Sequence, residues 1–280
     1  MMQSIAHRNA DPSLLEEYEQ IIIDECHAVA APATEAALRH VNVRNWAGLT
    51  ATPYRADQMN GLITMQCGPI RHVIDSADRA HRELITHVTT FTTEEPGTDG
   101  PSIQAIYSEL AADVARNTMI AQHLRDAVDC GRTCLVLTNR LGHLDALADA
   151  IEGCDAPVFR LHGRMAAAER HEVRKELRAA DAQQRPFVLI AIDKIAGEGL
   201  DLPTLNTLFL AVPVSFRGRV IQQLGRITRG RTEAPLPAVV HDYRDKDVPL
   251  LERMYARRRR VMAKEGFQTA EQAGPPRPQS

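Results

Sequence analysis

The sequence predicts an α/β fold built on parallel β-sheets, and two observations support this prediction. From about residue 134 onward, short apolar runs alternate with amphipathic stretches of about ten or more residues, which is typical of βαβ units. The apolar runs are also nearly continuous, as expected for strands that helices cover on both faces. We therefore expect strands and helices to alternate through most of the chain.

The predicted elements follow one another most regularly in the second half of the chain. Apolar residues at helical spacing predict one long helix over residues 103–129, which Cys130-Gly131 ends. Strands are predicted at residues 20–23, 46–49, 134–137, 158–161, 187–192, 208–212 and 239–241. Further helices are predicted at residues 141–151, 166–180 and 220–228.

Composition narrows the classes of protein to be considered. The 280 residues carry a formal net charge of −3, so any nucleic-acid contact must come from local basic patches rather than from an overall basic excess. The five cysteines form no CxxC pair and no zinc-type spacing, which suits a reducing compartment. No apolar stretch approaches the roughly 20 residues that span a bilayer. We therefore expect a cytoplasmic protein without a membrane partner.

The first motif whose residues could take part in catalysis or metal binding is Ile21-Ile22-Ile23-Asp24-Glu25-Cys26-His27. An apolar strand delivers two adjacent acids to its carboxyl end, where open α/β sheets bind ligands. Asp24 is a candidate ligand for Mg²⁺, which prefers carboxylate oxygens, and Glu25 could orient an attacking water. The same pattern also fits a strand followed by a helix whose first turn carries acids.

Two further strand ends carry small polar residues and glycines. Thr50-Ala51-Thr52-Pro53 follows the strand at 46–49, and its hydroxyls could couple a nucleotide site to a neighbouring domain. Gly197-Glu198-Gly199-Leu200-Asp201 follows the strand at 187–192, where glycine permits close backbone approach and Asp201 could accept a hydrogen bond from a ribose. Each segment also fits a plain turn.

The fourth motif is Gln222-Gln223-Leu224-Gly225-Arg226-Ile227-Thr228-Arg229. On a helix, Gln222, Arg226 and Arg229 share one face, because they lie at positions i, i+4 and i+7. Two guanidinium groups on one face can hold a γ-phosphate through charge-assisted hydrogen bonds. A solvated basic helix face is the alternative.

The order of these four motifs resembles that of superfamily 2 helicases of the DEAD/DEAH type. The resemblance covers about residues 16–245 and is nearest to the branch that includes the helicase subunits of restriction-type systems. It implies two RecA-like parallel-sheet domains, the N-terminal one incomplete and the C-terminal one complete, with ATP and Mg²⁺ bound between them. It also implies nucleic acid as partner, with DNA favoured over RNA.

The resemblance assigns roles to individual residues. Asp24 and Glu25 would be the Walker B pair, with Asp24 on Mg²⁺, and His27 would face the arginine helix that carries Gln222, Arg226 and Arg229. Nucleotide-side and coupling roles would fall to Thr50, Thr52, Gly199 and Asp201. Contacts with the nucleic-acid backbone would come from Asn139, Arg140, His162 and Arg164, although ordinary βα loops explain these residues equally well.

The sequence departs from the family at two points. No lysine follows a glycine, so the phosphate-binding loop GxxxxGK[ST] is absent, and we expect ATP affinity to be low unless an upstream polypeptide supplies this loop. Ile192 stands where the family commonly has threonine. The predicted organisation is a partial N-terminal RecA-like domain (1–92), a linker (93–102), a C-terminal RecA-like domain (103–265) and a disordered tail (266–280).

Two functions are compatible with this pattern. The chain could be the C-terminal part of an ATP-dependent helicase or translocase, which the four ordered motifs favour. Alternatively, it could be a non-catalytic nucleic-acid-binding or interaction module, or an inactive gene fragment, which the missing loop favours. The basic run at residues 257–260 would serve a binding module, although an exposed helix face explains it as well.

Overall fold

The computed structural model confirms the α/β class. It describes residues 18–26, 38, 43–50, 60–73, 82–93, 102–192, 201–214, 217–228 and 236–269. The chain divides into two compact units. The N-terminal unit comprises Met1–Ala77 with Phe216–Gln222, and the C-terminal unit comprises Asp78–Ser215 with Gln223–Ser280. None of the described helices is both long and apolar enough to cross a membrane.

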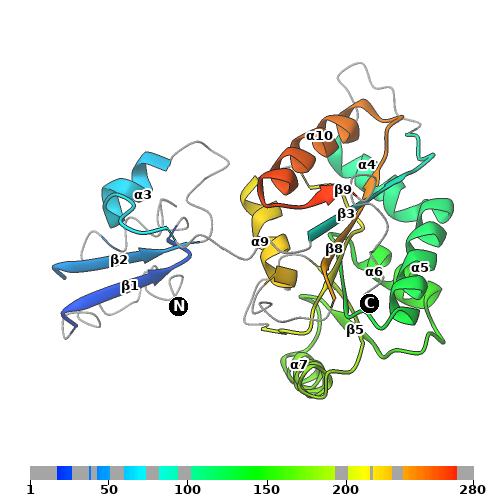
Figure 1. Ribbon diagram of the computed structural model, residues 1–280, viewed down its shortest axis with the longest axis horizontal. Coiled ribbons are helices and arrows are strands. Elements are labelled where there is room, and N and C mark those ends of the chain that lie inside the picture. The colour runs from blue at the N-terminus through cyan, green and yellow to red at the C-terminus, as the bar shows by residue number, and fades with distance from the viewer. Residues whose placement is uncertain are drawn as a thin grey trace, which may run out of the picture. The chain divides into compact units, whose positions relative to one another are not determined.

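The C-terminal unit is built on a seven-stranded sheet with the order β5-β6-β4-β7-β8-β3-β9, in which all neighbours are parallel (Figure 1). The strands are β3 (Arg82–Val88), β4 (Cys134–Thr138), β5 (Val158–Leu161), β6 (Val188–Ile192), β7 (Thr207–Leu210), β8 (Ala238–Arg244) and β9 (Gln268–Thr269). The central strands are almost entirely buried, which explains why their sequences are continuous apolar runs.

Helices cover both faces of this sheet (Figure 1). They are α4 (Ile103–Ala112), α5 (Val114–Asp129), α6 (Leu141–Ala150), α7 (Ala167–Ala182) and α10 (Pro249–Lys264), while α9 (Arg217–Thr228) contains residues of both units. One apolar core lies between α5 and α6 on one side and strands β4, β6, β7 and β8 on the other. A second core joins α4, α10 and Phe91.

Where one helix was predicted over residues 103–129, the structure has two. Asp113 separates α4 from α5 with an extended backbone (φ −68°, ψ 109°). Its carboxylate accepts the backbone N–H of Arg116 at 2.7 Å and thereby caps the N-terminus of α5. The apolar spacing continues across this break, so periodicity alone does not reveal it. The predicted end of the long helix at Cys130-Gly131 is confirmed, with Gly131 at φ +71°.

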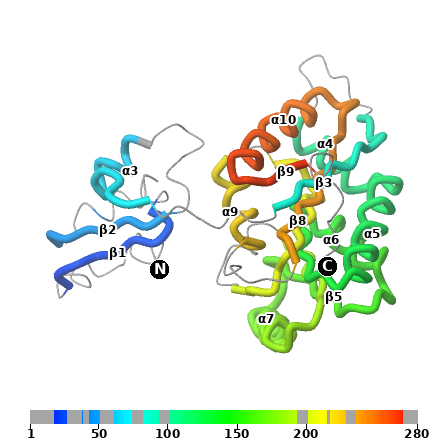
Figure 2. The backbone as a smooth tube through the Cα atoms, viewed as in Figure 1, coloured from blue at the N-terminus to red at the C-terminus, as the bar shows by residue number. Residues whose placement is uncertain are grey.

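Two segments of the C-terminal sheet fall outside the range predicted for its domain. Residues 82–88, within the predicted N-terminal range 1–92, form β3 and pair with β8. β9, within the predicted tail, pairs with the other side of β3. Figure 2 shows β3 beside β8 and β9 although they are distant in sequence. Local patterning does not specify which sheet a strand joins, because its partners lie far along the chain.

Two buried ion pairs connect β8 and the turn after it to helices. Arg116 of α5 donates from Nε to Asp245 at 3.0 Å, and both side chains are at most 1% exposed. Arg258 of α10 donates from Nε to Asp242 at 2.8 Å and is equally buried. The basic run at residues 257–260 is therefore not one exposed face, since its second arginine belongs to the core while its other three are exposed.

In the N-terminal unit, the described residues between 18 and 73 include two parallel strands and the helix α3. β1 (Gln20–Asp24) pairs with β2 (Asn45–Leu49), and α3 (Asn60–Cys67) follows. A small core gathers the side chains of Ile23, Cys26, Leu38 and Ile63. Gly48 is essential to its packing, because a Cβ there would lie 2.9 Å from Cys26 Sγ.

Candidate nucleic-acid interface

A groove of about 1060 Å³ opens on the C-terminal unit, and all four residues predicted to contact a nucleic-acid backbone line it. Asn139 and Arg140 come from the loop after β4, whereas His162 and Arg164 come from the loop after β5. Asn139 and Arg164 are exposed, and the other two are partly exposed. The structure thus brings together two segments that the sequence separates.

The sheet topology explains why these loops meet. β4 and β5 lie on either side of β6, and all three strands are parallel, so their carboxyl ends share one edge of the sheet. Ligands of open α/β sheets bind at this edge. Ile192, the last residue of β6, also lines the groove. The position where the sequence departs from its family therefore lies among the predicted contact residues.

A buried polar network supports the floor of the groove. The hydroxyl of Thr138 lies 2.9 Å from Nδ1 of His143, and Nε2 of His143 lies 2.9 Å from Oδ1 of Asn117. The amide of Asn117 in turn donates to the carbonyl of Ala111 in α4. Burial lowers the pKa of His143 to about 3, so the imidazole is neutral and accepts from Thr138 while donating to Asn117.

This network was not predicted from the sequence. His143 stands four residues after Asn139, within a helix whose apolar spacing explains its position without any polar role. Only the tertiary structure shows that it joins the end of β4 to α5 and, through Asn117, to α4.

The loop after β4 presents both a guanidinium group and a helix N-terminus. Arg140 donates from one nitrogen to the backbone carbonyl and side-chain oxygen of Gln104, at 2.7 and 3.0 Å, which fixes the guanidinium. Arg140 is also the N-cap residue of α6, and no side-chain cap bond occurs there among the described residues. The first backbone N–H groups of α6, at Leu141 and Gly142, therefore lie at the groove.

The loop after β5 forms a short turn that carries the second pair of residues. Met165 donates its backbone N–H to the carbonyl of His162, and the backbone N–H of His162 lies 3.4 Å from Sδ of Met165. Nδ1 of His162 is buried and makes no hydrogen bond with any described residue. The exposed Arg164 completes the basic character of this side of the groove.

The acidic motif lies at the carboxyl end of β1, as predicted. Asp24 is exposed, and its Oδ1 accepts the backbone N–H of Glu25 at 3.0 Å. Glu25 has the unusual backbone angle φ +53°, and it accepts a hydrogen bond from the hydroxyl of Thr50 at 3.4 Å. The register of β1 and β2 explains this contact, because Asp24 pairs with Leu49. Three predicted site residues therefore meet at one strand end.

The predicted arginine helix is α9. Its buried side chains include Val220, Leu224 and Ile227, at helical spacing. Gln222 and Arg226 are partly exposed and lie on the other side of the helix. Their predicted convergence with Asp24 and Glu25 on one phosphate stays a prediction.

Five predicted site residues remain. His27, Thr52, Gly199 and Arg229 lie outside the described residues. Asp201 is exposed, and it precedes the buried Leu202 without lining the groove.

Two protein-family models match the chain. The model of the helicase conserved C-terminal domain matches residues 116–231, which include α9 and the groove residues Asn139, Arg140, His162 and Arg164. The model of the type III restriction enzyme res subunit matches residues 1–55, which include Asp24, Glu25 and Thr50. The predicted relation to restriction-type helicase subunits is thereby confirmed.

Individual proteins agree with these families. A protein of Acanthamoeba polyphaga mimivirus, named provisionally as an ATP-dependent RNA helicase, is 24% identical over 253 residues, covering 86% of this chain and 46% of the relative. Helicase 161L of Invertebrate iridescent virus 6, also a provisional name, is 28% identical over 265 residues, covering 91% and 58%. The chain spans about half the length of these relatives.

A solved structure supports the fold. A variant of S. cerevisiae Dbp5 bound to RNA and ADP BeF3 superposes with a TM-score of 0.58 at 10% identity, covering 91% of this chain and 59% of that one. Identity this low shows the fold alone, which is the RecA-like fold that was predicted. Together with the two family matches, it supports the predicted resemblance of the chain to superfamily 2 helicases, with a helicase-type C-terminal domain at residues 116–231.

Proposed function

We propose that the groove binds the sugar–phosphate backbone of a nucleic acid. The C-terminal unit would then be the domain through which a helicase or translocase holds the nucleic-acid strand, its track, along which it moves. The observation that carries this proposal is the convergence of Asn139, Arg140, His162 and Arg164 on one groove from two separate loops. The names of the relatives, which include RNA helicases, support it. The match to a restriction-enzyme subunit favours DNA as the track.

The chemistry of the groove suits phosphate rather than base recognition. Two guanidinium groups and the uncapped N-terminus of α6 offer N–H donors of the kind that bind phosphate oxygens. Asn139 adds an exposed amide, and the buried Nδ1 of His162 has no partner among the described residues. Contacts of this kind fix the register of a strand without reading its sequence. We therefore expect binding that depends little on sequence.

For the N-terminal unit we propose that Asp24 and Glu25, at the end of β1, act as the Walker B pair. Asp24 fits Mg²⁺, because its carboxylate is exposed and, among the described residues, Oδ1 alone accepts a hydrogen bond, from the backbone N–H of Glu25. Glu25 and Thr50 would connect the metal site to the rest of the motor. The 280 residues contain no GxxxxGK[ST] loop, so they lack the groups that hold the β-phosphate of ATP in this family.

The binding proposal is tested by fluorescence anisotropy with labelled single-stranded DNA and RNA over a range of salt concentrations. The variants Arg140→Gln and Arg164→Gln should each weaken binding about tenfold or more, because a hydrogen bond to a charged group contributes about 1.5–3 kcal/mol. The slope of log K against log salt should decrease by about 0.7 for each arginine, the value for one lost phosphate contact on a single strand.

The matched control is Arg178→Gln, which removes an exposed arginine of α7 outside the groove. It should leave both affinity and salt slope unchanged. Equal losses in all three variants would show that net charge rather than the groove governs binding. Unchanged binding in both groove variants would refute the proposal.

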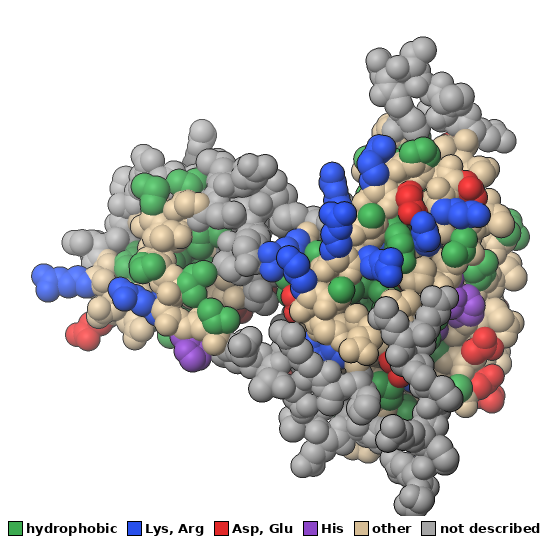
Figure 3. Space-filling model, turned by 45° about the horizontal axis from the view of Figure 1, so that its top comes forward, with side chains coloured by type: hydrophobic (Ala, Val, Ile, Leu, Met, Phe, Trp, Pro, Cys, Tyr) green, Lys and Arg blue, Asp and Glu red, His purple; other side chains and the backbone are tan. Residues whose placement is uncertain are grey.

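The alternative function is a nucleic-acid-binding module without motor activity. The exposed arginines of α10 favour it, and Figure 3 shows Lys and Arg side chains gathered on the face of the C-terminal unit where α10 lies. Hydrolysis of ATP by the full chain, stimulated by nucleic acid and abolished by Glu25→Gln, would identify a motor. Salt-dependent binding without hydrolysis would identify the module.

A further inference from the structure

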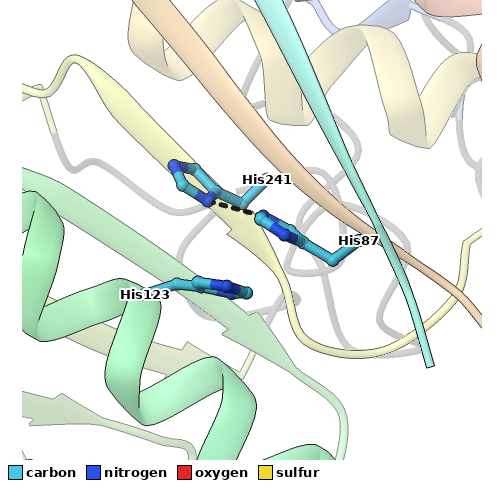
Figure 4. Close-up of side chains that lie close together, drawn as sticks. All are labelled: His87, His123 and His241. Carbon is cyan, nitrogen blue, oxygen red and sulfur yellow. Dashed lines mark hydrogen bonds between the residues drawn. The ribbon is translucent and has the colours of Figure 1, made fainter. Parts of the chain in front are cut away.

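Three histidines from distant parts of the chain meet beside the C-terminal sheet, away from the groove. His87 is near the end of β3, His241 is in β8, and His123 is on α5 (Figure 4). One nitrogen from each ring lies within 4.8 Å of the other two. The closest pair is Nε2 of His87 and Nδ1 of His241, at 3.0 Å.

The environment keeps these imidazoles neutral. Burial and the neighbouring His123 lower the pKa of His87 to about 4, and burial with the other two rings lowers that of His241 to about 3. Burial also lowers the pKa of His123. Neutral imidazole nitrogens are the usual histidine donors to transition metals.

The rings have the neighbours that a metal-binding histidine needs. The hydroxyl of Tyr243 lies 3.1 Å from Nδ1 of His123, and with that nitrogen donating to the oxygen, Nε2 holds the lone pair. Metal-ligating histidines commonly have such an outer partner, which sets the tautomer. Phe209 stacks on His241 with ring centroids 4.2 Å apart and limits the movement of that ring.

The distances are close to those of a zinc site. Zn–N bonds of about 2.0–2.1 Å in a tetrahedral site separate ligand nitrogens by about 3.4 Å. The 3.0 Å between Nε2 of His87 and Nδ1 of His241 is near this value, and a nitrogen of His123 lies within 4.8 Å of a nitrogen of each. A metal lies in the plane of each imidazole ring, whereas His87 and His123 are stacked with centroids 3.8 Å apart. Rotation of His123 about χ2, a torsion with broad minima, would turn its nitrogen toward the other two.

We propose that His87, His123 and His241 form a binding site for one divalent transition-metal ion, with Zn²⁺ the best fit. His87 and His123 are only partly buried, so solvent reaches the cluster and a water can complete four-coordination. The ion would tie β3 to β8 and to α5. This role is independent of the groove, because none of the three histidines lines it.

The test is a titration of the full, untagged chain with ZnCl₂ by isothermal calorimetry, together with the visible absorption spectrum after addition of CoCl₂. We expect one binding site, whose affinity for Zn²⁺ falls by more than about 100-fold in His123→Gln. Loss of an outer partner alone lowers metal affinity by about 10–100-fold, so a larger loss indicates a direct ligand. Tyr243→Phe keeps the ring that packs in the core and should weaken binding by about 10–100-fold. Zn²⁺ should also raise the melting temperature of the unmodified chain but not that of His123→Gln.

The matched control is His171→Gln, which removes an exposed histidine of α7 and should leave Zn²⁺ binding unchanged. Circular dichroism establishes that each variant is folded. The five cysteines could hold a zinc ion of their own, and thiolate charge-transfer absorption of Co²⁺ would reveal such a site. Equal Zn²⁺ affinity in the unmodified chain, His123→Gln and Tyr243→Phe would overturn the proposal, as would Co²⁺ bound only through thiolates.

Discussion

The two units support their predicted functional residues in different ways. In the C-terminal unit, the groove rests on seven parallel strands and on the buried chain Thr138–His143–Asn117. In the N-terminal unit, the described part of the acidic strand end rests on two strands and a four-residue core. Among the described residues, eight large hydrophobic side chains are exposed, and six of them belong to this smaller unit: Tyr18, Ile22, Leu49, Met65, Ile70 and Val73.

Because of this difference, we expect the two sites to differ in local stability. A site anchored by many buried contacts opens only when its whole unit unfolds, whereas one with few such contacts opens locally at lower free energy. The only tryptophan, Trp46, lies in β2. Its fluorescence therefore reports on the N-terminal unit, while far-UV circular dichroism reports mainly on the helices of the C-terminal unit.

The largest expected effect follows from breaking a buried ion pair. Arg116→Met leaves the carboxylate of Asp245 buried without its charged partner, which should lower the stability of the C-terminal unit by about 3–5 kcal/mol. Urea unfolding followed by circular dichroism measures this loss.

The control for this prediction is Arg160→Met, which breaks the exposed bridges to Asp145 and Asp149. It should cost at most about 1 kcal/mol. If the transition reported by Trp46 fluorescence shifted as much as that of circular dichroism in Arg116→Met, the two units would unfold as one and would not differ in local stability.

Acid should weaken the support of the groove through His143. Its pKa is about 3 in the folded chain and near 6.5 when unfolded, so below pH 6.5 the unfolded state binds a proton that the folded state does not. The contribution of His143 to the free energy of unfolding should be fully present above pH 6.5. It should fall by up to about 1.4 kcal/mol per pH unit toward pH 3.

The variant His143→Gln isolates this effect. Urea unfolding at several pH values should give a shallower acid slope than the unmodified chain, with up to one proton fewer taken up on unfolding. Identical slopes would mean that His143 is protonated in the fold.

Overpacking should affect the N-terminal unit alone. In Gly48→Ala, the new methyl group would meet the side chains of Cys26 and Cys67 at 2.9 Å. We expect a loss of about 1–3 kcal/mol, seen in the Trp46 transition and absent from the circular dichroism transition. Gly61→Ala is the control, since a Cβ there meets nothing within 4 Å.

The smallest effect concerns the departure from the family at the groove. Ile192→Thr would add a hydroxyl among the predicted contact residues. One added hydrogen bond contributes about 0.5–1.5 kcal/mol, so affinity for single-stranded nucleic acid should rise about two- to tenfold. Unchanged affinity in the anisotropy assay would indicate that the strand does not reach the end of β6.

The sequence predicted those features that local patterns determine. Buried parallel strands such as Cys134–Thr138 are recognisable as apolar runs, and the acids after β1 mark a strand end. Long-range features had no such signal. The break at Asp113 lies within continuous apolar spacing, β3 joins a sheet formed mainly by later residues, and His143 acquires its partners only through packing.

The pairing of β3 with β8 and β9 has a consequence for synthesis of the chain. β3 leaves the ribosome well before its neighbours, and Arg82 donates to the carbonyl of Glu265, which lies 183 residues further along. Contacts of such high sequence separation form slowly, because a long loop must close before they are made. The backbone N–H and C=O groups of β3 therefore stay unpaired until β8 and β9 have been synthesised. Formation of this side of the sheet should be a late event in folding.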